Sequence, residues 1–153
     1  MSSISNTGFA EASDRVTSET GSAVRPFIVA AGRLFYVAIF LMSGLTHFTA
    51  KPIAYAAAAG VPFPPLAVPA SGVLALAGAL SILLGYRARI GARLLVLFLV
   101  PVTLMMHNFW VVKDPMMAQI QIALFMKNLS MLGGALLISQ FGAGPWSLDA
   151  RQK

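Results

Sequence analysis

Four long stretches of the sequence are almost entirely apolar, and polar residues concentrate between and around them. The stretches are residues 27–48, 66–86, 90–112 and 117–141. Each is long enough to cross the roughly 30 Å hydrocarbon core of a bilayer as a helix, which takes about 20 residues. A helix satisfies its own backbone hydrogen bonds in lipid, whereas an isolated strand does not. The pattern therefore predicts an all-α membrane protein built as a bundle of four transmembrane helices.

Shorter polar segments flank and connect these stretches. Residues 1–24 are rich in Ser and Thr and lack the apolar centre of a signal peptide, so we expect a disordered cytoplasmic tail there. Residues 25–145 are expected to form the transmembrane domain, and residues 146–153 a second cytoplasmic tail. Between the first two stretches, residues 52–59 can form a short helix that lies on the outer face.

The composition agrees with a lipid environment. Hydrophobic residues make up 58% of the chain and charged residues 10%, with a mean hydropathy of +0.78. Soluble domains average about 25% charged residues, so an ordinary water-soluble domain is excluded. The chain contains no cysteine, which excludes disulfides, thiol redox relays and thiolate metal sites.

The distribution of Lys and Arg predicts the orientation, because cytoplasmic segments of membrane proteins are enriched in them. With the N-terminus inside, most basic residues lie on or near the cytoplasmic side: Arg15, Arg25, Arg33, Arg87, Arg89, Arg93, Arg151 and Lys153. Only Lys51 and Lys113 then lie outside, so both termini are expected in the cytoplasm, beneath an inner membrane. The net charge of +6 does not indicate nucleic-acid binding, because the basic residues flank apolar stretches and form no basic-aromatic surface.

Small residues are frequent in the second and fourth stretches, where they allow helices to approach closely in lipid. We expect them to form the interior seams of the bundle: Ala70, Ser71, Gly72, Ala75, Gly78, Ala79, Ser130, Gly133 and Gly134.

An internal similarity relates the first and third stretches. Arg33 and Arg93 stand near their starts, and His47 and His107 follow these arginines at the same spacing. Both stretches run outward, as a parallel duplication of a two-helix unit requires. Chance similarity between apolar helices is the alternative.

The few polar side chains inside or at the ends of the stretches define the candidate site. His47, His107, Lys127 and Asn128 are expected to form a polar cofactor-binding site in the outer half of the bundle. A quinone headgroup fits such donors, and haem ligation by the two histidines is a second possibility. The alternative is that the histidines make only interfacial hydrogen bonds while Lys127 extends to the membrane surface. The cofactor itself stays unknown.

Motifs spread over most of the chain resemble the DoxX family of small four-helix membrane proteins. They are Gly32-Arg33, Ser43-Gly44, Ala59-Gly60-Val61-Pro62-Phe63-Pro64, Gly85-Tyr86-Arg87-Ala88-Arg89, His107-Asn108-Phe109-Trp110, Phe125-Met126-Lys127-Asn128-Leu129, Gly133-Gly134 and Trp146-Ser147-Leu148-Asp149. The resemblance implies a four-span inner-membrane protein linked to redox metabolism, since the family is named for subunits associated with a thiosulfate:quinone oxidoreductase. Relatives often have a Lys at the position of His47 and a Glu at that of Ala75, and the loss of this Glu removes a partner for Lys127.

Two functions follow as expectations. The first is a component of a quinone-linked redox system that uses the polar site. The second is a non-catalytic membrane scaffold or assembly partner that binds oxidoreductase subunits. Both place the chain in the lipid bilayer, and both leave open whether it is an enzyme and whether it forms a homo-oligomer.

Overall fold

The computed structural model describes the backbone of residues 7–152 and the side chains of residues 24–152. This part of the chain is helical and contains no strand. The elements in order are α1 (Thr7–Thr46), α2 (Ala50–Ala58), α3 (Pro64–Leu84), α4 (Ala88–Met106), the short 3-10 helix η1 (Phe109–Val111), α5 (Pro115–Phe141) and α6 (Leu148–Arg151).

Four of these helical segments are long and apolar enough to cross a membrane: Val24–Thr46, Pro64–Leu84, Ala88–Val111 and Pro115–Phe141. They coincide with the four predicted stretches to within a few residues. The all-α, four-helix membrane architecture predicted from the sequence is therefore confirmed. The short helix expected around residues 52–59 is also present, as α2.

The N-terminal segment differs from the expected disordered tail. Helix α1 begins at Thr7, so residues 7–24 of that tail are helical, while residues 1–6 lie outside the described residues. Composition alone points away from helix here, but adding turns to an existing helix avoids the unfavourable nucleation step. The C-terminal tail also has a defined structure, because it forms α6 and contacts the bundle.

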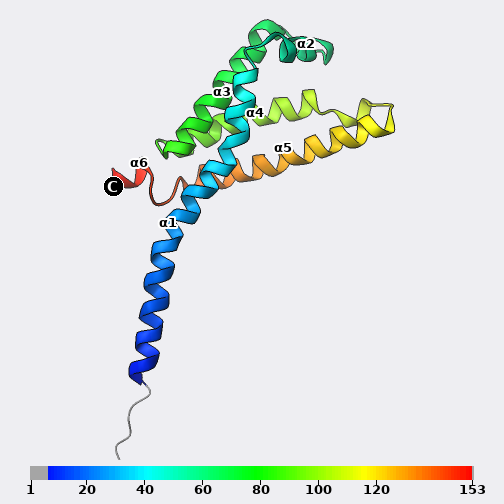
Figure 1. Cartoon of the computed structure of the whole chain (residues 1–153). Coiled ribbons are helices and arrows are strands. Elements are labelled where there is room, and N and C mark those ends of the chain that lie inside the picture. Colours follow the sequence, from blue (N-terminus) through cyan, green and yellow to red (C-terminus); the bar gives the residue numbers. More distant parts are fainter. Residues whose placement is uncertain (1–6, 153) are drawn as a thin grey trace, which may run out of the picture.

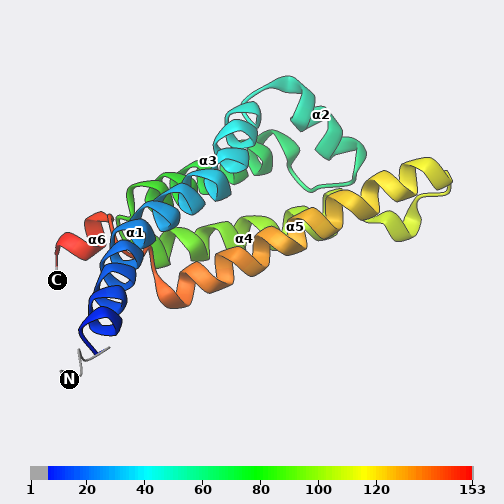
Figure 2. The same ribbon diagram turned by 60° about the horizontal axis from the view of Figure 1, so that its bottom comes forward.

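The four long helices form two pairs that diverge (Figures 1 and 2). Helix α1 runs beside α3, and α4 runs beside α5, while α3 and α4 make the most extensive contact of any two helices, from the turn that joins them to the level where they separate. We call the end where the pairs meet the α6 end, and the end where they separate the α2 end. The pairing is what a duplicated two-helix unit would produce, although the duplication itself stays a prediction.

Glycines lie where the long helices cross most closely. A Cβ at Gly72 would stand 2.7 Å from the Cβ of His47, and a Cβ at Gly78 would stand 2.8 Å from the carbonyl oxygen of Gly91. Small residues permit such close approach in a membrane, where packing drives helix association. Of the small residues expected to form seams, Gly72, Ala75, Gly78 and Ala79 are buried, whereas Ala70 and Ser130 are exposed. In the fourth span a Cβ at Gly134 would stand 2.7 Å from the ring of Tyr36, whereas Gly133 has no neighbouring atom within 4 Å.

Large apolar side chains fill the space between the helices. The largest fully buried ones are Phe40, Ile82, Leu95, Leu99 and Val37. The ring of Phe40 meets that of Phe98 edge-on, with ring centroids 6.2 Å apart. This core connects α1, α3 and α4 up to the level at which the two pairs separate.

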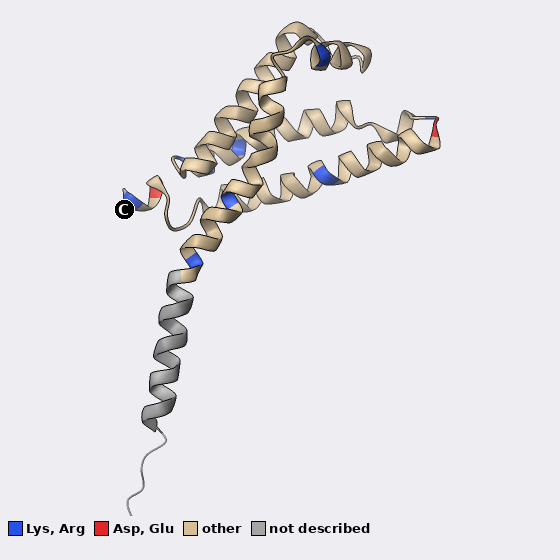
Figure 3. Ribbon diagram, in the orientation of Figure 1, with Lys and Arg blue, Asp and Glu red and all other residues tan. Residues whose placement is uncertain are grey.

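Polar contacts secure the α6 end. The carboxylate of Asp149 accepts hydrogen bonds from the backbone N–H groups of Arg87 (2.7 Å) and Ala88 (3.0 Å), and so caps the start of α4. The Arg33 guanidinium donates to the carbonyl of Trp146 over 2.6 Å. The segment after α5 is therefore fastened across the turn between α3 and α4. Lys and Arg positions occur within the helices as well as at their ends in Figure 3; Arg33 lies inside α1, Arg93 inside α4 and Lys127 near the middle of α5.

Candidate functional site

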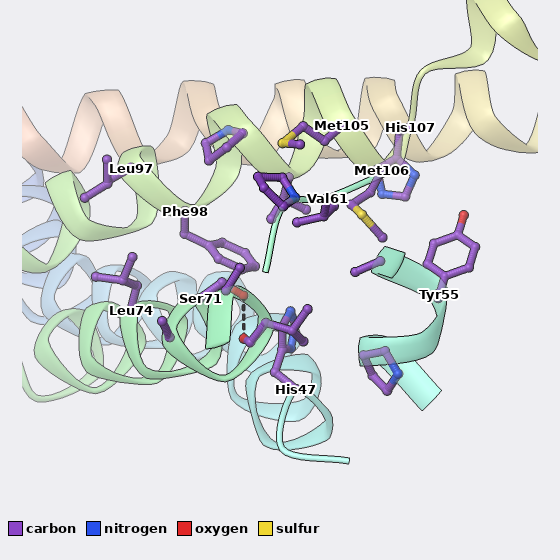
Figure 4. A pocket seen from close by; sticks show the side chains of 18 residues that line it. His47, Tyr55, Val61, Ser71, Leu74, Leu97, Phe98, Met105, Met106 and His107 are labelled. Atoms are coloured by element: carbon purple, nitrogen blue, oxygen red, sulfur yellow. Dashed lines mark hydrogen bonds between the residues drawn. The ribbon is translucent and has the colours of Figure 1, made fainter. Parts of the chain in front are cut away.

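A cavity of about 470 Å³ lies at the α2 end of the bundle. Its walls come from the end of α1, from α2 and the loop after it, and from the facing sides of α3 and α4 (Figure 4). Most of the lining is apolar, with Leu74 on α3 and Leu97, Phe98 and Met105 on α4. The cavity exists because the two helix pairs diverge here, and α2 covers part of the space between them.

The loop that closes the cavity follows from its residue types. Helix α2 ends before Gly60, whose φ of 78° is a left-handed conformation that favours glycine. The chain then passes through Val61 and Pro62, both of which line the cavity, and α3 starts with Pro64 at its first position. Proline suits a helix start because it lacks the backbone N–H that would have no helical partner there.

Both histidines singled out from the sequence line this one cavity. His47 directly follows the end of α1, and His107 directly follows the end of α4, so the fold brings the two residues to the same end of the bundle. Two segments that are far apart in the sequence thus each place an imidazole in a mostly apolar cavity.

The His47 ring is fixed by its own helix and by α4. Its Nδ1 lies 2.7 Å from the carbonyl oxygen of Ser43, one turn earlier in α1. The ring also packs edge-on against Phe98, with centroids 5.7 Å apart. These contacts leave Nε2 as the ring atom available to a ligand.

The His107 ring belongs to a chain of polar contacts that crosses three elements. Its Nδ1 lies 2.9 Å from Oε1 of Gln121 on α5, and Nε2 of the same Gln121 donates to the hydroxyl of Tyr55 on α2 over 3.2 Å. Tyr55 also lines the cavity. The site expected from the sequence did not include Tyr55 or Gln121; Gln121 stands out as a polar residue of the fourth span, but no local pattern signals its contacts with positions so far apart.

Lys127 and Asn128 do not join the histidines. Lys127 is exposed on the surface of the described chain, whereas Asn128 is buried with 4% of its surface accessible, and neither lines the cavity. Neighbouring residues on a helix point about 100° apart, and the packing of α5 turns Asn128 inward and Lys127 to the surface. Of the four residues expected from the sequence to form one site, His47 and His107 therefore line one cavity, and Lys127 and Asn128 lie elsewhere.

Comparisons with known proteins overturn the resemblance to DoxX. The sequence matches the SURF4 family over residues 9–153. It is also 30% identical over 131 residues to the inner membrane protein YphA of Escherichia coli (strain K12). The matched segment covers 84% of this chain and 93% of that protein. No solved structure matches it.

The motifs that suggested DoxX lie mostly at helix ends, turns and crossings. Gly60 and Gly85 adopt positive φ at helix ends, and Asp149 caps a helix. Residues of these kinds shape the turns and helix ends of this fold, and by themselves they do not identify a family. The match over nearly the whole chain decides the matter: the protein is an integral membrane protein of the SURF4 family.

Proposed function

We propose that the protein binds a small amphipathic molecule of the quinone class in the cavity at the α2 end, as a component of a membrane redox system. One observation carries the proposal: two imidazoles from distant segments face one cavity whose walls are otherwise mostly apolar. Small-molecule sites combine apolar walls with a few polar groups that orient the ligand.

The size and walls of the cavity suit such a ligand. Its volume of about 470 Å³ lies within the range of about 300–1,000 Å³ typical of small-molecule sites. Phe98 offers a flat apolar face to a ring and Leu74 adds apolar contact, while the two histidines offer ring nitrogens at its edge. The cavity is only partly enclosed, so an isoprenoid tail has room to extend into the surrounding lipid.

Ligand titration tests this proposal directly. The purified protein in lipid nanodiscs is titrated calorimetrically with decylubiquinol, the reduced form of a soluble quinone analogue, kept reduced under argon, alongside the variants His47→Ala and His107→Ala. Each substitution removes one hydrogen bond to the ligand, and we expect the dissociation constant to rise about tenfold, the equivalent of 1.4 kcal/mol. Lys127→Ala is the matched control because Lys127 is exposed and lies outside the cavity.

Two results would count against the proposal. Equal affinity of the wild type and both histidine variants would remove the cavity as the binding site. A Soret band in the purified protein that disappears in the histidine variants would replace quinone with haem.

The proposal also places the protein in an inner membrane with both termini in the cytoplasm. The relative YphA is named an inner membrane protein, and the basic residues of this chain favour cytoplasmic termini, so the α2 end faces outward. The chain has no cysteine, so single cysteines placed at Lys51 and at Arg151 can be labelled with a membrane-impermeant maleimide on intact cells. We expect labelling at residue 51 and none at residue 151; the reverse pattern would invert the topology.

A second function, assembly with a partner protein, is favoured by Lys127. This side chain is exposed near the middle of α5, and no Asp or Glu lies in any of the four spans to pair with it. An ionisable group at the centre of a span costs about 2.5–3.5 kcal/mol on insertion scales, so a contact from an oxidoreductase subunit or a second copy would relieve it. Purification from native membranes tests this: a stoichiometric partner should be retained by the wild type and lost by Lys127→Leu.

A further inference from the structure

The polar side chains that line the cavity differ in whether their N–H and O–H hydrogens are already used in hydrogen bonds within the protein. His47 donates from Nδ1 to the carbonyl oxygen of Ser43, since a carbonyl oxygen can only accept and the two atoms are 2.7 Å apart. The neutral imidazole has one N–H only, so its Nε2 carries a lone pair and accepts. A ligand that meets His47 therefore meets an acceptor.

Ser71 presents the same polarity. Its hydroxyl donates to the carbonyl oxygen of Val68 over 2.7 Å, the contact drawn as a dashed line in Figure 4. The single hydroxyl hydrogen is thus in use, and only the lone pairs of Oγ remain for a ligand.

His107 repeats the arrangement of His47. The Oε1 atom of Gln121 accepts from its Nδ1 at 2.9 Å, while the Nε2 of Gln121 donates to the hydroxyl of Tyr55. The Nε2 atom of His107 is then an acceptor as well. Tyr55 accepts from Gln121 and keeps its own hydrogen, so it can still donate.

The rest of the lining adds no side-chain donor. The described residues that line the cavity include no Lys, Arg, Asn, Gln or Trp, and Pro52, Pro62 and Pro101 have no backbone N–H. The cavity therefore offers a ligand three side-chain acceptors, which are Nε2 of His47, Nε2 of His107 and Oγ of Ser71, and one donor, the hydroxyl of Tyr55. A quinone carries two carbonyl acceptors and would leave most of these groups without a partner, whereas the two hydroxyl groups of a quinol can donate to them.

Resting on the proposed function, we infer that the cavity selects the reduced, hydroxyl-bearing form of its ligand, a quinol, and that His47, His107 and Ser71 determine this selectivity. His47, Ser71 and His107 are half-buried, so a bound ligand that covers these acceptors without donating to them removes their water and leaves them without a partner, which favours the quinol.

Three ligands with one ring framework test the inference on the wild-type protein in nanodiscs at pH 8, where an ordinary imidazole is neutral. They are decylubiquinol, kept reduced under argon, decylubiquinone, and the dimethyl ether of decylubiquinol, which has the shape of the quinol without its donors. We expect the quinol to bind at least tenfold more tightly than either of the others. A quinone that binds as tightly as the quinol would overturn the selectivity but leave the proposed function standing, whereas no binding of any of the three would overturn both.

A second test uses a substitution that changes the hydrogen-bonding character of one side chain in the cavity without removing that side chain. His47→Gln replaces a fixed acceptor with an amide that can also donate, so the preference for quinol over quinone should fall several-fold while quinone affinity is kept or raised. Gln140→Ala, on the exposed surface near the other end of α5, should keep the wild-type preference. An unchanged preference in His47→Gln would remove His47 from the selectivity-determining residues.

Discussion

The crossing of α3 and α4 at Gly78 has no room for a side chain, and this provides a quantitative test of the fold. A Cβ at this position would stand 2.8 Å from the carbonyl oxygen of Gly91 and 2.8 Å from Cδ2 of Leu95, whereas ordinary contact begins at 3.4 Å. The two helices would have to separate by the difference, about 0.6 Å. The carbonyl belongs to the backbone of α4 and cannot rotate aside as the end of a side chain can.

Overpacking of this kind typically costs 1–3 kcal/mol. We therefore predict that Gly78→Ala lowers the free energy of unfolding by about 2 kcal/mol. The measurement is reversible unfolding in mixed micelles with increasing SDS, followed by far-ultraviolet circular dichroism at a fixed temperature.

Gly133→Ala is the matched control, because a Cβ there would meet no atom within 4 Å. Alanine is preferred to glycine inside a helix by roughly 0.5–1 kcal/mol, so this variant should be as stable as the wild type or slightly more stable. If both variants unfold with the same free energy, α3 and α4 do not cross at Gly78 in the membrane and the reasoning fails.

Three further substitutions test the contacts that hold the helices together. Asp149→Ala removes the carboxylate that caps α4 and should lower the free energy of unfolding by about 1 kcal/mol in the same assay; no change would show that the cap is not formed. Tyr36→Phe removes the hydrogen bond of 2.7 Å that joins α1 to α5, from the Tyr36 hydroxyl to the carbonyl of Met131. The free energy of unfolding should fall by about 1 kcal/mol, and unaltered stability would contradict this contact. Gly85→Ala would force a side chain against Ser147 at a φ of 63°, so α6 should detach and become sensitive to trypsin; continued resistance would contradict this contact.

The four spans could be predicted from the sequence because their signal is local. An unbroken apolar stretch of the right length is sufficient, and the third predicted stretch, residues 90–112, agrees closely with the helical segment Ala88–Val111. The start of α1 at Thr7 could not be predicted in the same way. Its polar residues favour disorder when considered alone, and their helical state depends on the adjoining membrane helix.

The site was predictable only in part. His47 and His107 each end a span that runs in the same direction, so a shared end of the bundle follows from topology. The rotation of α5 does not, because this helix is apolar on nearly all sides and no polar face indicates which side points inward. The different environments of Lys127 and Asn128 are decided by tertiary packing.

The crossings and the cavity are two consequences of one arrangement. Close approach at Gly78 and the hydrogen bond of Tyr36 hold the helix pairs together toward the α6 end, and the pairs diverge from there to make room between His47 and His107. A change that wedges α3 from α4 should therefore alter ligand affinity as well as stability, because the angle between the pairs sets the width of the cavity. The cap provided by Asp149 lies beyond the crossing at the α6 end, so its removal should weaken the fold without reshaping the site.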